Sequence, residues 1–201
     1  MQKIPTLFRR EFDERTHKIK DIKNWITPGC ETAFHRGVST IKWDGSCCAI
    51  FDGKFYKRYD AKKGKPIPEN AIRCQDEPDP VTGHMPCWVQ CVRDNPADKW
   101  FWNAYDYYAQ NSTEPLTDGT YEAIGLHFNG NAYSYDYDTL IRHGERKCCV
   151  GRTFNEVKEW LETHNEEGIV FWYGGEPACK IKRTDFGLPW PIKKEDRHEN
   201  N

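Results

Sequence analysis

Short apolar runs separated by glycine-containing turns constrain the fold of this chain more than any other feature. The pair Asp52-Gly53 lies between the apolar run 47–51 and the segment 54–59, which reads as a returning strand. Asp-Gly tolerates the positive φ angles that a tight two-residue hairpin requires. The segment therefore predicts two antiparallel strands joined by a short turn.

The C-terminal part repeats this pattern. Residues 169–172, Ile-Val-Phe-Trp, form a continuous apolar run typical of a buried strand. The pair Gly174-Gly175 then turns the chain into a further predicted strand over 178–182. Another strand is predicted over 120–128, after Asp118-Gly119 and before Asn129-Gly130.

Helical patterns lie between the predicted strands. A helix is expected over 154–164, because Thr153 and Glu156 have the spacing of a capping box. A second, rich in Trp and Tyr, is expected over 98–109, whereas the proline-rich segment 61–87 indicates a long loop. The fold class that follows is α+β, with mainly antiparallel sheets flanked by helices.

Composition limits where the protein is expected to act. No apolar run approaches the roughly 18 residues that a membrane-spanning helix needs, and the N-terminus lacks the apolar stretch of a secretory signal. The nine cysteines are odd in number and include two adjacent pairs, which favours reduced thiols. We therefore expect an intracellular protein, in the cytoplasm or in a host cytoplasm. Cys74, His84, Cys87 and Cys91 have zinc-ligand side chains, but their spacing matches no compact zinc finger.

The charge is nearly balanced over the whole chain. Lys and Arg number 29 and Asp and Glu 31, a net charge of −2, which argues against non-specific nucleic-acid binding over the entire surface. One stretch is locally basic and is either a solvated face or a groove for nucleic acid. It comprises Lys54, Lys57, Arg58, Lys62, Lys63 and Lys65.

The tetrapeptide Lys42-Trp43-Asp44-Gly45 contains a candidate nucleophile. A lysine amine attacks only when it is neutral, and nearby cations or burial favour that form. Asp44 is placed to orient the amine or to hold a metal-bound water. The pattern alone is weak, because Lys-x-Asp-Gly occurs by chance in roughly one chain of this length in twenty. A surface turn is the simpler interpretation of an isolated Asp-Gly pair.

Two later segments add charged residues of the right kind. Glu167 immediately precedes the buried run at 169–172, and Lys180 and Lys182 alternate with Ile181 on the next predicted strand. A carboxylate and two ammonium groups at the ends of paired strands have the chemistry to hold a metal and a phosphate. A capping acid and a polar strand face are the alternatives that do not involve function.

The order of these residues resembles the covalent nucleotidyltransferase superfamily of DNA ligases, RNA ligases and mRNA-capping guanylyltransferases. That family has Lys-x-Asp-Gly, an Arg after a hairpin, a Glu within a strand, a Glu-Gly strand and finally Lys-x-Lys. The matching positions here cover most of the chain and are Lys42, Arg58, Glu122, Glu167, Lys180 and Lys182. Ser46 follows the glycine, as it often does in RNA ligases, and Cys47 occupies the position where DNA ligases and capping enzymes usually have Arg. More narrowly, several stretches resemble the 5′–3′ RNA ligases related to vertebrate RNA ligase 1.

The resemblance implies a nucleotidyltransferase (adenylation) domain over residues 1–190, with a polar tail at 191–201 and no separate OB-fold domain. It implies that Lys42 becomes covalently adenylylated by ATP, that Lys180 and Lys182 stabilise the α-phosphate, and that Asp44 and Glu167 hold Mg²⁺ or Mn²⁺. Glu122 and Arg58 are then expected to bind the ribose or a phosphate, and the backbone of Ile41 the adenine edge. Phe128, Trp172 and Tyr173 are candidates for stacking on the purine, although core packing is the more common role for such residues.

The implied activity is ATP-dependent joining of RNA 5′-phosphate and 3′-hydroxyl ends through adenylylated RNA, by a protein expected to be a monomer without a membrane partner. Three alternatives stay open at this point: a capping-type guanylyltransferase, a DNA ligase, and a binding protein for nucleic-acid ends that has lost catalysis. His143 has no role in this scheme and is interpreted as a structural histidine.

Overall fold

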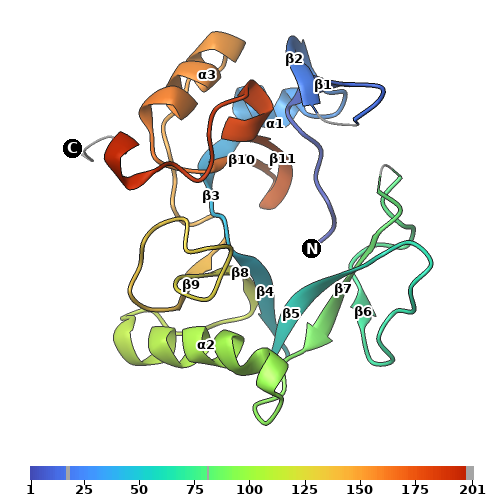
Figure 1. Cartoon of the computed structure of the whole chain (residues 1–201), viewed down its shortest axis with the longest axis vertical. Coiled ribbons are helices and arrows are strands. Elements are labelled where there is room, and N and C mark those ends of the chain that lie inside the picture. The colour runs from blue at the N-terminus through green and yellow to red at the C-terminus, as the bar shows by residue number, and fades with distance from the viewer. Residues whose placement is uncertain (17–18, 81, 198–201) are drawn as a thin grey trace. The chain divides into compact units, whose positions relative to one another are not determined.

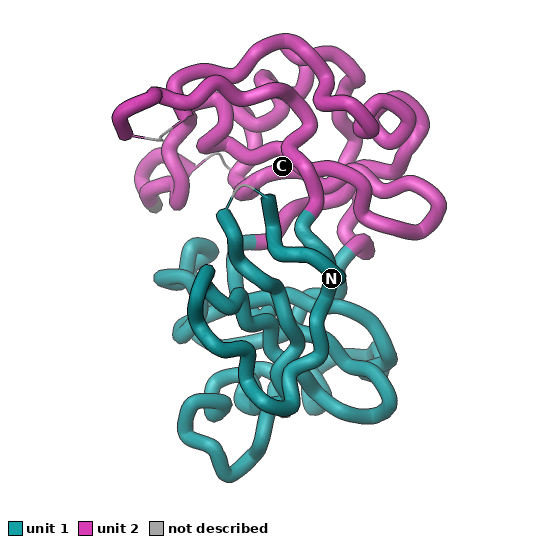
Figure 2. The backbone as a smooth tube through the Cα atoms, turned by 90° about the vertical axis from the view of Figure 1, so that its right-hand side faces the viewer, with its two compact units in different colours: residues 1–3, 44–143 teal, residues 4–43, 144–201 magenta. Residues whose placement is uncertain are grey.

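A computed structural model of the protein describes residues 1–16, 19–80 and 82–197. It is an α+β structure, and every pairing between its named strands is antiparallel. The chain divides into two compact units (Figure 2). Unit 1 consists of residues 1–3 and 44–143, and unit 2 of residues 4–43 and 144–201. The fold class predicted from sequence is confirmed, while the single adenylation domain over 1–190 stays a prediction.

Unit 1 is built on a six-stranded sheet of order β6-β7-β5-β4-β8-β9. Its central hairpin has Asp52 and Gly53 at φ 52° and 66°, as the sequence predicted. The strands are β4 (Ser46–Phe51), β5 (Lys54–Ala61), β6 (Ile72–Arg73), β7 (Met85–Gln90), β8 (Gly119–Ile124) and β9 (Thr139–Arg142).

The helix α2 (Lys99–Asn111) packs on one face of this sheet, beside β8 and β9 (Figure 1). It follows the short helix η1 (Pro96–Asp98) and presents Phe101, Trp102 and Tyr105 to the sheet. Alternate strand residues meet them in a buried cluster, whose strand members are Cys48, Ile50, Phe55, Tyr121, Ala123 and Leu140. Because side chains alternate across a strand, the neighbours of these residues point to the other face.

Unit 2 contains a three-stranded sheet of order β11-β10-β3 and a separate two-stranded sheet, β1-β2. Phenylalanine side chains from different segments pack edge to face in its core, with Phe8 against Phe34 and Phe154 and Phe34 against Phe171. The elements are β1 (Phe8–Phe12), β2 (Ile19–Ile26), α1 (Glu31–Arg36), β3 (Val38–Lys42), α3 (Phe154–Thr163), β10 (Gly168–Tyr173), β11 (Glu176–Lys182), η2 (Arg183–Phe186) and η3 (Lys194–Asp196).

Several sequence predictions hold in detail. Thr153 caps α3 and accepts a hydrogen bond from the backbone N–H of Glu156 at 3.3 Å. The strand predicted over 169–172 is β10, and the strand predicted over 178–182 is β11, which begins two residues earlier at Glu176. All nine cysteines are free thiols, as their odd number and pairing suggested.

Other predictions are wrong. The segment 61–87 is not a continuous loop, because it contains β6 and the start of β7, where Pro86 pairs with Asp60. The strand predicted over 120–128 ends at Ile124, because Gly125 takes a φ of 128° that few other residues adopt. The N-terminal forty residues, for which no element was predicted, supply α1, the described parts of β1 and β2, and most of β3.

Candidate functional site

The three-stranded sheet of unit 2 places Lys42, Gly168 and Lys182 in one row. Gly168 is paired with Lys42 of β3 on one side and with Lys182 of β11 on the other. A Cβ atom on residue 168 would lie 2.2 Å from the carbonyl oxygen of Ile181, so only glycine fits there. The two lysines are thus held on either side of a position that has no side chain.

The strand register also fixes which way these lysines point. The next row contains Ile41, Ile169 and Ile181, all buried. Side chains alternate between the two faces of a sheet, so the isoleucines occupy the face opposite to the lysines. The third row pairs Val170 with Lys180, which returns Lys180 to the lysine face. Burial of one face therefore sets the direction of all three ammonium groups.

Glu167 lies next to this row and neutralises part of its charge. Its carboxylate forms an ion pair with the Nζ atom of Lys42, and its second oxygen lies 3.8 Å from the Nζ atom of Lys182. The Glu167 side chain is 8% exposed, so water screens these interactions weakly. We call Lys42, Glu167, Lys180 and Lys182 the lysine cluster.

Lys180 carries the clearest electrostatic signature in the lysine cluster. Burial, followed by repulsion from Lys42 and Lys182, lowers the pKa of Lys180 from 10.5 to about 8. Glu167 opposes this shift, and Arg10 adds to it. Strongly perturbed lysines of this kind are more frequent at functional sites than elsewhere on protein surfaces.

Asp185 anchors the end of β11 next to the lysine cluster. Its carboxylate accepts a hydrogen bond from the backbone N–H of Lys182 at 2.8 Å and pairs with the Arg10 guanidinium at 2.6 Å. The side chain of Asp185 is fully buried, which makes this contact a fixed support for the strand. It also ties the hairpin residue Arg10 to the strand that carries Lys180 and Lys182.

The lysine cluster has the charge to bind a phosphate. Three ammonium groups face one carboxylate, and the deprotonated form of Lys180 is within reach at mildly basic pH. A preorganised set of cations stabilises negative charge that develops on a transferring phosphoryl group. The partly buried Lys42 side chain, 21% exposed, is the member for which the sequence pattern predicted a nucleophilic role.

Asp44 and Gly45 of the Lys-x-Asp-Gly pattern lie in unit 1. The backbone N–H of Asp44 donates to the hydroxyl of Tyr133 at 2.7 Å, and Asn129 donates to the Asp44 carboxylate at 2.9 Å. Asn129 also donates to the Gly45 carbonyl, so the turn is held by side chains. A Cβ atom at position 45 would lie 2.1 Å from the carbonyl oxygen of Ala123, which explains the glycine.

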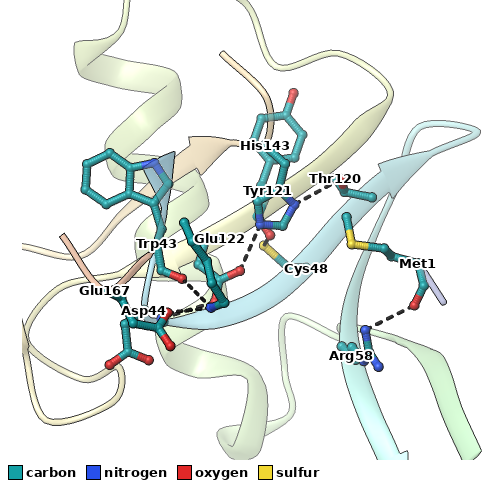
Figure 3. A network of polar contacts seen from close by, with 12 residues as sticks. Met1, Trp43, Asp44, Cys48, Arg58, Thr120, Tyr121, Glu122, His143 and Glu167 are labelled. Carbon is teal, nitrogen blue, oxygen red and sulfur yellow. Dashed lines mark hydrogen bonds and ion pairs between the residues drawn. The ribbon is translucent and has the colours of Figure 1, made fainter. Parts of the chain in front are cut away.

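Glu122 is part of a polar network in unit 1 that sequence reasoning missed (Figure 3). Its carboxylate lies 2.8 Å from Nε2 of His143 and accepts a hydrogen bond from the backbone N–H of Gly45 at 3.1 Å. The other ring nitrogen of His143 lies 3.0 Å from the hydroxyl of Thr120. His143 therefore fixes a carboxylate that the resemblance assigns to the nucleotide. The sequence alone does not indicate this contact, because residues 122 and 143 come together only through the pairing of β8 with β9.

Two members of the predicted basic stretch are engaged within unit 1. Lys57 forms an ion pair with the buried Asp98, and Arg58 pairs with Asp60 at 2.8 Å while donating to the carbonyl of Met1 at 3.0 Å (Figure 3). A cavity of about 450 Å³ adjoins Arg58 and Cys47. The other four members are exposed, and three of them, Lys62, Lys63 and Lys65, line a cavity of about 300 Å³.

The candidate adenine contacts differ in their surroundings. The backbone N–H of Ile41 donates to the carbonyl of Arg146 at 2.8 Å. A backbone contact with adenine would therefore use the carbonyl oxygen of Ile41. Phe128 is buried in the core of unit 1, and the indole N–H of Trp172 donates to the hydroxyl of Thr40. Tyr173 is 50% exposed, so it is the candidate ring with the largest free surface.

The structure thus gathers Lys42, Glu167, Lys180 and Lys182 in unit 2, and it places Asp44, Arg58 and Glu122 in unit 1. In the described part of the chain, no helix is both long and apolar enough to cross a bilayer. No protein-family model matches the chain, and no curated protein matches it.

Proposed function

We propose that this protein is an ATP-dependent RNA ligase that joins 5′-phosphate and 3′-hydroxyl ends. The observation that carries the proposal is the lysine cluster on one face of the β11-β10-β3 sheet. The order of the motifs along the sequence selected four residues that are spread over 140 positions: Lys42, Glu167, Lys180 and Lys182. That the same four residues share one small surface of unit 2 supports a common chemical role.

In the first step, the neutral amine of Lys42 attacks the α-phosphorus of ATP. A nitrogen–phosphorus bond forms, and the bond to the bridging oxygen breaks, so that pyrophosphate leaves with the electron pair. Glu167 contacts the Lys42 amine and is placed to orient it or to hold its proton. Lys180 and Lys182 stabilise the negative charge on the α-phosphate, because their ammonium groups share a sheet face with Lys42.

In the later steps, the adenylyl group moves from Lys42 to the 5′-phosphate of an RNA. The 3′-hydroxyl of a second end then attacks this activated phosphate, and AMP leaves. Phosphoryl transfer depends on positioning and charge stabilisation more than on covalent help from the protein. A surface built from lysines and a carboxylate is suited to that task.

The carboxylates present fit the preference of Mg²⁺ for oxygen ligands. Glu167 is the unit 2 carboxylate that we assign to Mg²⁺ or Mn²⁺. When bound, such an ion neutralises charge on the phosphates. We assign ribose or phosphate contacts to Glu122, which His143 and Gly45 hold in place, and to Arg58.

The test is intact-mass measurement of the purified full-length chain after incubation with ATP and Mg²⁺. We expect a mass increase of one adenylyl group, mapped to Lys42 and absent from Lys42→Ala. Lys158→Ala is the matched control, because the Lys158 side chain on α3 is 45% exposed and pairs with Glu162 of the same helix at 3.6 Å. That variant should form the adduct normally.

Parallel incubations distinguish the alternatives. An adduct with GTP alone would identify a capping-type guanylyltransferase, and sealing of nicked DNA in preference to RNA would identify a DNA ligase. Binding of 5′-phosphorylated RNA without any adduct would identify a non-catalytic end-binding protein. Each of these results would replace the proposed function.

A further inference from the structure

We propose that Cys47, Glu122 and His143 of unit 1 form a binding site for a transition-metal ion of the zinc class. Each side chain offers one ligand atom, and the three atoms all lie within 4.8 Å of one another. All three residues are partly buried, so a bound ion would be sheltered while remaining reachable. Within the residues that the structure describes, no such group is formed by the four possible zinc ligands noted from the sequence, which are Cys74, His84, Cys87 and Cys91.

Strand pairing places the three ligands on one face of the six-stranded sheet. Cys47 of β4 is directly paired with Glu122 of β8, so their side chains point to the same side. His143 follows β9, and its backbone N–H donates to the carbonyl of Thr120 at 3.0 Å. Thr120 precedes Glu122 by two residues, which puts His143 on the same side of the sheet.

The surroundings of two ligands are those of a prepared metal site. Metal-binding histidines usually donate the second ring nitrogen to an oxygen, and ligating carboxylates are themselves hydrogen-bonded. Here Nδ1 of His143 lies 3.0 Å from the Thr120 hydroxyl, and one oxygen of Glu122 accepts the Gly45 N–H. These contacts leave Nε2 of His143 and the other Glu122 oxygen facing each other at 2.8 Å.

A zinc ion fits between these two atoms with little movement. Bonds of about 2.0 Å in tetrahedral geometry put neighbouring ligand atoms about 3.3 Å apart. The histidine and carboxylate atoms would therefore need to separate by about half an ångström from their present 2.8 Å. Three protein ligands leave the fourth position for water or another small ligand.

The ligand types select the class of ion. Sulfur and imidazole nitrogen beside a carboxylate suit Zn²⁺ and its neighbours in the first transition row, whereas Mg²⁺ and Ca²⁺ prefer oxygen alone. A thiolate and a carboxylate would balance the charge of a divalent ion. Burial and then the Glu122 charge raise the pKa of the Cys47 thiol to about 12, whereas Arg58 lowers it. A thiol that coordinates a metal ion loses its proton, so binding at this site should release one.

The site shares Glu122 with the nucleotide contacts proposed above, but its test uses metal binding alone and stands whether or not the protein is a ligase. The reduced, chelator-treated full-length chain is titrated with Zn²⁺ against a chromophoric chelator. We expect one equivalent to bind, with at least a tenfold loss of affinity in Cys47→Ala and in His143→Ala. Thr120→Val should weaken binding about tenfold, because it removes only the supporting oxygen. Cys149→Ala, which changes an exposed thiol, should bind like the wild type.

A Co²⁺ titration gives a second readout that needs no comparison of affinities. Bound Co²⁺ should show a thiolate-to-cobalt absorption band in the wild type and in Cys149→Ala. The band should be lost in Cys47→Ser, a variant that preserves side-chain size and whose folding is checked by circular dichroism. Absence of a one-equivalent site in the wild type, or an unchanged band and affinity in folded Cys47 variants, would overturn the inference.

Discussion

Lys42 and Lys182 lie in the same row of the three-stranded sheet, one on each side of Gly168, and both face the carboxylate of Glu167. Two ammonium groups therefore share one carboxylate, while Lys180 adds a third positive charge to the same face. The surplus charge is held in place by backbone pairing and by the buried isoleucines behind it. This arrangement leads to predictions that test the geometry separately from the activity.

The pKa of Lys180 should respond in opposite directions to two neighbouring substitutions. Lys182→Ala removes a repelling cation and should raise the pKa of Lys180 above about 8, whereas Glu167→Gln removes an attracting carboxylate and should lower it. Lys42 and Arg10 are the other charged groups that act on this amine. NMR of ¹³C-methylated lysines, titrated with pH, measures both shifts.

The lowered pKa of Lys180 also predicts how the stability of the folded chain changes with pH. The pKa of Lys180 is lower in the folded chain than its ordinary 10.5, so the buried ammonium form is unfavourable to folding below about pH 8. That penalty should be relieved as the pH rises from about 8 to 10.5. Urea unfolding of wild type and Lys180→Met should converge across this interval. A constant difference would show that Lys180 titrates normally.

Gly168→Ala should destabilise the protein. The new methyl group would meet the carbonyl oxygen of Ile181 at 2.2 Å, and overpacking of this kind costs about 1–3 kcal/mol of unfolding free energy. The matched control is Gly174→Asn in the turn that follows β10. Gly174 has open space around it and a φ of 61°, which asparagine tolerates, so the control should be neutral. Equal stability of both variants in urea would contradict the register described for β10 and β11.

Lys180→Ala and Lys182→Ala should each slow formation of the Lys42 adduct. Removal of one preorganised donor to a developing negative charge typically lowers the rate about 10²–10³-fold. Single-turnover adenylylation with radiolabelled ATP measures the effect, and Lys158→Ala serves as the surface control. If both variants react at the wild-type rate, the lysine cluster does not stabilise the α-phosphate.

The sequence predicted those parts of the fold whose signals are local. The Asp52-Gly53 hairpin, the Thr153 cap and the apolar run of β10 each lie within one short segment, and each is confirmed. The N-terminal elements carry no comparable signal. The charged strand β1 does not alternate clearly, and Cys30 precedes α1 without any capping hydrogen bond from its side chain.

The candidate site shows the same limit. The motif order placed Lys42, Glu167, Lys180 and Lys182 in one group, and the strand register then accounts for their common face. No such pattern links His143 to Glu122 or Cys47, because those contacts depend on which strands pair in unit 1. The prolines of 61–87 prevented the prediction of β7 for a related reason. A strand tolerates a proline such as Pro86 only where the missing backbone N–H is not needed for pairing, which depends on the neighbouring strands.

Charge reversal at Lys62 and Lys63 should weaken RNA binding. Both side chains are exposed on the loop after β5, and they line a cavity together with Lys65 and Arg73. Each lost phosphate contact should reduce the slope of log affinity against log salt by about 0.7 for single-stranded RNA. Lys158→Glu changes the net charge by the same amount per residue and should leave the slope unchanged. A salt-independent effect would remove this loop from the proposed RNA surface.

Asp98 provides a structural prediction for the segment that leads into α2. Its buried carboxylate pairs with Lys57 and accepts hydrogen bonds from the backbone N–H of Val92 at 2.9 Å and from Asn95 at 3.1 Å. Asp98→Ala leaves these donors unsatisfied and should cost about 2–3 kcal/mol of unfolding free energy.

The matched control for this change is Asp94→Ala, because Asp94 is an exposed carboxylate in the same loop and its loss should change stability by less than about 0.5 kcal/mol. Asp98→Asn separates charge from hydrogen bonding, since the amide oxygen still accepts from Val92 while the ion pair with Lys57 is lost. Its destabilisation, measured by urea unfolding, should fall between those of the two alanine variants. Equal stability of Asp98→Ala and Asp94→Ala would mean that Lys57 and the Val92 amide find other partners, and that this buried ion pair does not hold the loop to β5.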